Sequence, residues 1–196
     1  MERSPLTRAS LVAAAADLAD REGFDVVTIS AVARQVGVKP ASIYSHLKDL
    51  AALLDGVHEL ALGELADLIA GGIAGRSGRD ALAALGQAHR DYARGHPGRW
   101  SAMQRPAGPA VAGSAAAARI VEYIWAVLRG YDLPANELVH ATRFVGATLN
   151  GYLALEKAGS YDHRSEHTDT SWQRTLAALD RALQTWATAL EGEAPA

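Results

Sequence analysis

The sequence has no cysteine and few aromatic residues. Aromatic side chains make up 6% of its 196 residues, and methionine and phenylalanine occur only twice each. Without cysteine the chain can form neither a disulfide nor a cysteine-ligated metal site. Alanine is abundant and has the highest helix propensity, whereas sheets favour aromatic and β-branched residues. The composition therefore predicts an all-α protein.

Long apolar segments are also missing. The sequence shows no signal-peptide pattern, and no uncharged apolar run is long enough to cross a bilayer. A hydrophobic content of 49% indicates a globular chain. A net charge of −3 argues against a protein that coats nucleic acid without selectivity. We expect a globular protein in the cytoplasm.

Sequence signatures of catalysis are absent or lie in the wrong context. The glycine-rich run at residues 71–78 lacks the Gly-Lys-Ser/Thr ending of a phosphate loop and follows no strand. His163 and His167 match the H-x-x-E-H zinc-peptidase pattern, but they lie in a predicted loop, where at most adventitious zinc or nickel binding is expected. No G-x-S-x-G motif and no paired-carboxylate signature occurs. We predict no enzyme, no cofactor and no metal site.

Residues 28–48, with the sequence TISAVARQVGVKPASIYSHLK, are predicted to form two short helices joined by a tight turn. Thr28 is the expected N-cap of the first helix. Gly37 supplies the backbone freedom of the turn, and Pro40 stands where the second helix should begin. Apolar residues recur at helical spacing along the first helix: Ile29, Val32, Ala33 and Val36. This is the layout of a helix-turn-helix, whose second helix enters the major groove of DNA.

The outward surface of this segment has the sign that DNA requires. Over residues 39–47 only Ile43 and Leu47 are expected to point inward. No Asp or Glu occurs in residues 28–48, whereas Arg34, Lys39 and Lys48 are basic. The acidic residues of the first 50 positions all lie outside this stretch. A phosphate-facing surface needs positive charge, so the pattern favours DNA binding; an amphipathic helix pair with a solvated basic face is the alternative.

The stretches AADLADREGFDVVTIS and AVARQVGVKPASIYSHLKDLAALL resemble the DNA-binding domain of the tetracycline-repressor (TetR) family of bacterial transcription regulators. The resemblance covers residues 7–54, and its most specific part is VGVKPASIYSHLKDL. This part combines the turn glycine, small residues that open the second helix and a Tyr-x-His pair that closes it. In the family a Phe usually follows that pair. Here Leu47 keeps an apolar side chain without the ring, and Lys48 is retained.

The resemblance implies a ligand-responsive regulator, expected to be a repressor, that binds double-stranded DNA at a palindromic operator. A small, largely apolar or aromatic molecule is expected to release it. The residue pattern and the resemblance together assign DNA contacts to Thr28, Lys39, Ala41, Ser42, Tyr44, Ser45, His46 and Lys48. The phosphate roles of Tyr44 and His46 rest on the resemblance. Two alternatives stay open: a ligand-binding helical protein or small helical enzyme, and an activator of the same fold without tight operator binding.

The rest of the chain is predicted to continue as helices, about nine in total. Residues 1–48 would form the three-helix DNA-binding domain, and residues 49–196 a helical bundle for ligand binding and dimerisation. The predicted helices cover residues 7–22, 28–36, 39–47, 49–70, 79–95, 97–103, 114–131, 134–158 and 170–191. Residues 105–113 are predicted as a loop because of their proline and glycine content.

Two properties are expected of the predicted bundle. Its inward positions mix large apolar and polar side chains, as small-molecule pockets do: His89, Tyr92, Trp100, Met103, Tyr123, Phe144, Thr148 and Asn150. The last two helices, residues 138–158 and 170–191, carry more apolar surface than one small bundle needs. A two-fold interface between two copies would bury it, so a homodimer through these helices is predicted.

Overall fold

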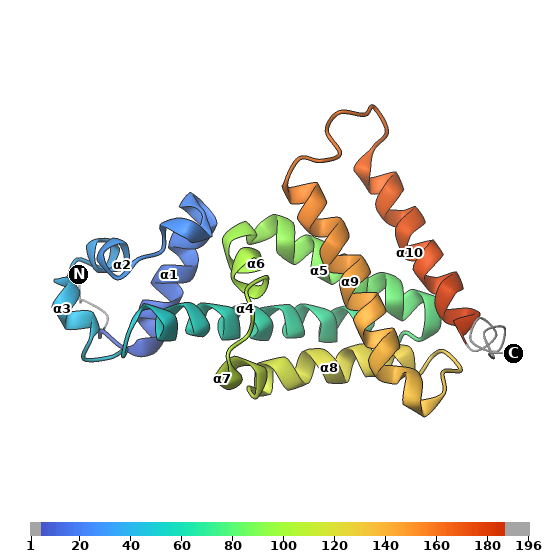
Figure 1. Cartoon of the computed structure of the whole chain (residues 1–196), viewed down its shortest axis with the longest axis horizontal. Coiled ribbons are helices and arrows are strands. Elements are labelled where there is room, and N and C mark those ends of the chain that lie inside the picture. Colours follow the sequence, from blue (N-terminus) through green and yellow to red (C-terminus); the bar gives the residue numbers. More distant parts are fainter. Residues whose placement is uncertain (1–4, 187–196) are drawn as a thin grey trace, which may run out of the picture. The chain divides into compact units, whose positions relative to one another are not determined.

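The computed structural model describes residues 5–186. The regular secondary structure of this part of the chain is all helical, with ten α-helices, two short 3-10 helices and no strand. Figure 1 shows the arrangement of the helices within the chain. The prediction of an all-α fold is confirmed. One helix more than the expected nine is present because α7, Pro109–Ala112, forms within the predicted loop at residues 105–113. Pro109 occupies its first turn, where a missing N–H costs nothing.

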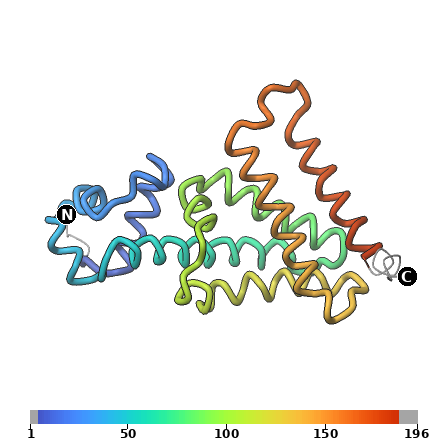
Figure 2. The backbone as a smooth tube through the Cα atoms, in the orientation of Figure 1, coloured from blue at the N-terminus to red at the C-terminus, as the bar shows by residue number. Residues whose placement is uncertain are grey.

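The described chain divides into two compact units. The first unit contains the described residues up to Leu65 together with Tyr92–Arg119, and the second contains Ala66–Asp91 and the described residues from Ile120 onward. Figure 2 traces the backbone by colour from the N-terminal to the C-terminal end, so that the residue ranges of each unit can be followed. The functional boundary expected at residue 48 stays a prediction.

The first unit contains α1 (Arg8–Glu22), η1 (Phe24–Val26), α2 (Ile29–Val36), α3 (Pro40–Ile43), the start of α4 (Leu50–Ile73), α6 (Pro97–Met103) and α7. Helix α1 begins at a capping box, in which Thr7 and Ser10 satisfy each other's backbone N–H. Apolar side chains of α1, α2, α3 and α4 form one core, with Leu11, Val32, Ile43 and Leu53 fully or almost fully buried. Burial of these faces, more than helix propensity, holds the short helices α2 and α3 in place.

Helix α6 packs closely on α1. A Cβ atom on Gly98 would lie 2.0 Å from the carbonyl carbon of Ala19, so only glycine allows this approach. The Asp20 carboxylate of α1 accepts hydrogen bonds from the backbone N–H groups of Gly98 and Arg99, each at 2.9 Å. These two N–H groups lie in the first turn of α6 and have no partner within their own helix. Residues far apart in the sequence therefore make α1 and α6 one packed element pair.

The second unit contains the end of α4, most of α5 (Gly78–Gly95), most of α8 (Ala115–Leu128), η2 (Ala135–Glu137), α9 (Leu138–Lys157) and α10 (Thr168–Gln184). On α10 the apolar side chains of Trp172, Leu176, Leu179 and Leu183 are buried. The part of that predicted helix beyond residue 186 lies outside the described residues.

On α9, two leucines that are two positions apart differ in burial. Leu153 is buried, whereas Leu155 is 48% exposed. The buried row runs through Ala141, Val145, Leu149 and Leu153 in steps of four residues. Leu155 lies two positions beyond Leu153, which is more than half a turn of helix away, so it points outward.

Candidate nucleic-acid interface

The first helix of the helix-turn-helix forms by the local rules that its sequence predicts. The Thr28 hydroxyl accepts a hydrogen bond from the Ala31 N–H at 3.1 Å, which confirms the N-cap. Gly37 has φ 70°, in the left-handed region. The N–H of Val38 then bonds back to the Ala33 carbonyl at 3.0 Å, which ends the helix in a Schellman-type turn.

The second helix is shorter than predicted. Regular α-helix covers Pro40–Ile43, whereas the prediction extended to residue 47. The Ser45 hydroxyl donates to the Ser42 carbonyl at 2.7 Å, in place of the His46 N–H that a regular α-helix would use there. The His46 N–H bonds instead to the Ile43 carbonyl at 2.9 Å, three residues back. Residues 44–46 are therefore a tight hydrogen-bonded turn that continues the short helix.

The burial pattern of this segment separates two sets of side chains. Ile43 and Leu47 are buried, at 0% and 4% exposure, as predicted, so Leu47 serves as an apolar anchor without an aromatic ring. All eight predicted DNA contacts are exposed: Thr28, Lys39, Ala41, Ser42, Tyr44, Ser45, His46 and Lys48. Among the large apolar residues of the described chain, Tyr44 is the most exposed, at 57%. The segment thus presents an acid-free surface with two lysines and an aromatic ring to solvent.

The eight predicted effector residues are divided between the two units. Tyr92, Trp100 and Met103 belong to the first unit, where Tyr92 and Trp100 are 1% exposed. The Tyr92 hydroxyl donates to Glu64 at 2.7 Å. Burial and this hydrogen bond raise the pKa of Tyr92 well above its ordinary value of 10.0. The phenol therefore stays neutral and is fixed in one orientation.

The second unit holds the other five: His89, Tyr123, Phe144, Thr148 and Asn150. His89 is 6% exposed, and its Nδ1–H donates to the Leu85 carbonyl at 2.8 Å. Burial lowers the pKa of His89 below its ordinary value of 6.5, so the ring is neutral at pH 7. Phe144, expected to point inward, is 37% exposed and packs on Trp186 at 5.5 Å between ring centroids. As effector contacts, all eight residues stay predictions.

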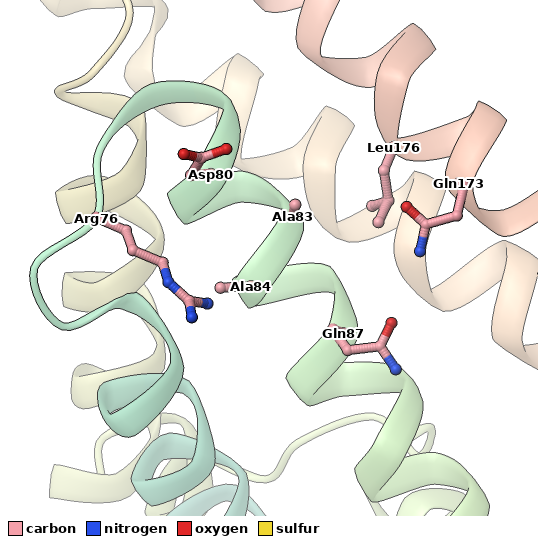
Figure 3. Close-up of a pocket in the computed structure, with 7 residues that line it drawn as sticks. All are labelled: Arg76, Asp80, Ala83, Ala84, Gln87, Gln173 and Leu176. Carbon is pink, nitrogen blue, oxygen red and sulfur yellow. The ribbon is translucent and has the colours of Figure 1, made fainter.

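Sequence reasoning missed a groove on the second unit (Figure 3). Its volume is about 440 Å³, and it is lined by residues of α5 and α10 and of the turn before α5: Arg76, Asp80, Ala83, Ala84, Gln87, Gln173 and Leu176. A second pocket, of about 540 Å³, lies at Tyr152 and Tyr161 and the start of α10. No predicted effector residue lines either. The spacing of Asp80, Ala84 and Gln87 marks one face of α5 and was the signal available in the sequence.

In residues 5–186 no three His, Asp or Glu side chains are grouped so that they could hold a metal ion. Over the same residues, none of the helices has both the length and the apolar character of a membrane span.

A helix-turn-helix with an exposed, acid-free recognition surface, joined to a helical body, defines the class of helix-turn-helix transcriptional regulators. Models of two families match the chain. "Bacterial regulatory proteins, tetR family" matches residues 11–57, and "Tetracyclin repressor-like, C-terminal domain" matches residues 82–179. The chain belongs to the TetR family of DNA-binding transcription regulators.

Relatives and solved structures agree with this assignment. An uncharacterised HTH-type transcriptional regulator of Mycobacterium tuberculosis, Rv0681, is 35% identical over 163 residues, which cover 80% of this chain and 73% of that protein. The uncharacterised HTH-type regulator YobS of Bacillus subtilis is 34% identical over 100 residues, covering 51% and 52% of the two chains.

Solved structures show the same fold at lower identity. BioQ of Mycobacterium smegmatis superimposes with a TM-score of 0.73 at 21% identity, over 92% of this chain and 99% of that one. The structure of BioQ with its natural double-stranded DNA operator gives a TM-score of 0.72 at 21% identity, with the same coverage. Apo ActR of Streptomyces coelicolor gives a TM-score of 0.73 at 17% identity, over 96% of this chain and 100% of that one.

Proposed function

We propose that this regulator is a homodimeric repressor that binds a palindromic operator and is released by a small, largely apolar or aromatic molecule. The observation that carries the DNA part is the surface of residues 39–48, where every residue except the buried Ile43 and Leu47 is exposed and none is acidic. Small side chains at Ala41 and Ser42 allow the helix backbone to approach base edges, and Lys39 and Lys48 supply phosphate contacts. BioQ, which has the same fold, has a solved structure in complex with its own DNA operator, and this supports the proposed DNA binding.

Dimerisation is supported by the outer surface of α9. Val139 and Leu155 are each 48% exposed and Phe144 is 37% exposed, which is unfavourable for apolar side chains in water. A second copy of α9 and α10 would bury them. Two copies are also what an operator of two half-sites requires, because one recognition helix contacts only a few base pairs.

The effector part rests on buried polar groups among apolar side chains. His89 is a neutral, oriented imidazole, and the Tyr92 hydroxyl is held by Glu64. Pockets for small molecules combine apolar walls with a few such groups. For release from DNA, the effector must bind the state that does not fit the operator more tightly than the state that does.

The test is selection of bound sequences from a random DNA pool, with the wild-type chain and with Ser42→Ala. The proposal expects the wild-type chain to enrich an inverted repeat, and Ser42→Ala to change the preferred bases at defined positions of each half. Ser30→Ala, an exposed serine on α2, is the matched control and should keep the preference. Enrichment of no sequence would favour the ligand-binding alternative. A broad screen of apolar and aromatic compounds against the selected operator then tests release.

A further inference from the structure

Arg90 of α5 is a buried cation that contacts both α9 and α10. Its residue exposure is 2%. Its Nη2 and Nε atoms donate to the two carboxylate oxygens of Glu156 on α9, at 2.5 and 3.2 Å. Its Nη1 atom pairs with Asp169 on α10 at 2.9 Å. The guanidinium also lies over the Trp172 ring of α10, 5.4 Å from the centroid.

The two acids stand at the facing ends of α9 and α10. Glu156 is next to the last residue of α9, and Asp169 is the second residue of α10. Between the helices lies a connection of ten residues, 158–167, without regular helix (Figure 1). A single guanidinium that binds both carboxylates fixes the distance between these helix ends, because its donors form a rigid planar fork.

Contacts one turn earlier on α5 strengthen this arrangement. A Cβ atom on Gly86 would lie 2.5 Å from Leu176 and 3.4 Å from Trp172, so α5 and α10 approach closely there. Tyr152 of α9 stacks on Trp172 at 4.9 Å, and its hydroxyl donates to the Thr168 carbonyl at the start of α10. Arg90 of α5 and Tyr152 of α9 therefore both contribute contacts that hold the facing ends of α9 and α10 together.

We infer that Arg90 is a positioning residue that sets the geometry of the α9–α10 pair for association with a second copy of the chain. The inference rests on the proposed dimer for its functional part. Buried ion pairs add little net stability, because desolvation offsets much of the attraction, but they can specify one arrangement over others. Loss of the forked guanidinium should therefore change the separation of the two helix ends and weaken the dimer.

The experiment measures that separation directly. The chain has no cysteine, so nitroxide labels can be placed selectively with Ala158→Cys and Thr170→Cys, both exposed. Labelled chains are diluted into excess unlabelled chain, and pulsed electron paramagnetic resonance gives the distance distribution within one subunit. The wild-type background should give one narrow distribution, and Arg90→Met a broader one that extends to longer distances.

Two further variants keep the test decisive. Arg90→Met removes the guanidinium from the partly buried Glu156 carboxylate and can prevent folding. Arg90→Lys keeps the charge, but a single ammonium lacks the fork that binds both carboxylates, so it should fold and still broaden the distribution. Arg129→Met, at an exposed arginine after α8, is the control and should match the wild type.

The dimer dissociation constant, from sedimentation velocity over a concentration series, provides the second measurement. We expect Arg90→Lys to raise it about tenfold and Arg129→Met to leave it within twofold. The inference would be overturned if every Arg90 variant that folds gave a narrow distance distribution and an unchanged dimer dissociation constant. A wild-type chain that stays monomeric would contradict the proposed dimer and this functional role, while the distance distributions would still decide whether Arg90 holds the helix ends.

Discussion

At the scale of single residues, Lys48 is the basic side chain at the end of the helix-turn-helix segment. It is exposed and follows the buried Leu47, so its ammonium group projects from a fixed backbone position at the end of the recognition segment. We expect a lysine in this position to bind phosphate as a point charge and to read no base. Its effect on DNA binding should therefore be independent of sequence and sensitive to salt.

We expect Lys48→Ala to weaken binding to the selected operator and to scrambled DNA by the same factor. The slope of log K against log salt should fall by about one unit, because one phosphate contact is lost. Fluorescence anisotropy at several salt concentrations measures both quantities. Lys157→Ala, an exposed lysine on the second unit, is the control with unchanged slope. A loss confined to the operator would instead indicate base recognition by Lys48.

His89 makes stability depend on pH. Its folded pKa lies below the ordinary value of 6.5, chiefly because of burial. Below pH 6.5 the unfolded chain binds a proton that the folded chain does not, so acidification favours unfolding. His58 acts in the same direction, because burial and Arg105 lower its pKa. The limiting effect is about 1.4 kcal/mol per pH unit for each such histidine.

We therefore expect the free energy of unfolding to fall between pH 7 and pH 5.5, and to fall less in His89→Gln. Urea unfolding at the two pH values provides the measurement. His163→Gln removes an exposed histidine and should keep the pH dependence of the wild type. Equal pH dependence in all three chains would mean that folding does not lower the pKa of His89.

At the scale of elements, the contact of α6 with α1 joins a segment around residue 98 to the core that supports the recognition helix. Asp20 receives both N–H groups of the first turn of α6, and its second oxygen lies 3.3 Å from Nε of Arg99. The same arginine pairs with Asp17 and Glu64. Directed polar contacts and the close packing at Gly98 therefore link α6 to α1.

Gly98→Ala should separate these two helices. The new methyl group would overlap the Ala19 backbone, which cannot move without shifting α1. We expect a loss of about 2–3 kcal/mol in unfolding free energy, seen as a melting temperature lower by roughly 5–10 °C. Gly95→Ala is the matched control, because a Cβ there meets nothing within 4 Å. Equal melting temperatures for the two variants would show that α6 can leave α1 without cost.

At the scale of the whole molecule, we expect association to depend on the exposed apolar side chains of α9. A charge at the centre of a two-fold interface is placed opposite its own copy and is desolvated, which opposes association strongly. A charge on an apolar residue outside the interface has no such effect. The position of the interface can therefore be tested with two similar substitutions.

Leu155→Glu should shift the chain to monomers at micromolar concentration, with far-ultraviolet circular dichroism unchanged. Val121→Glu, at a similarly exposed apolar residue of α8, should leave the dimer intact. Sedimentation velocity distinguishes the two. The reverse result would place the interface on α8, and dissociation by both variants would indicate an interface that includes both helices. The affinity for the operator should fall as the fraction of dimer falls.

Much of the fold could be predicted because its signals are local. The cap at Thr28, the left-handed Gly37 and the inward pair Ile43 and Leu47 follow from residue type and spacing, and the structure has them. The short α3 could not be predicted in the same way. Its end depends on whether the Ser45 hydroxyl or the His46 N–H donates a hydrogen bond to the Ser42 carbonyl. Hydrophobic periodicity does not distinguish these two hydrogen bonds.

The sequence by itself determined the helical class, the family and the exposed set of candidate DNA contacts, because these depend on periodicity, caps and an acid-free stretch. Only the tertiary structure decided which helices share a unit, that Gly98 lets α6 reach α1, and that Arg90 meets acids 66 and 79 positions further along the chain. Such contacts join residues distant in sequence. Their partners are chosen by packing, and no local pattern records that choice.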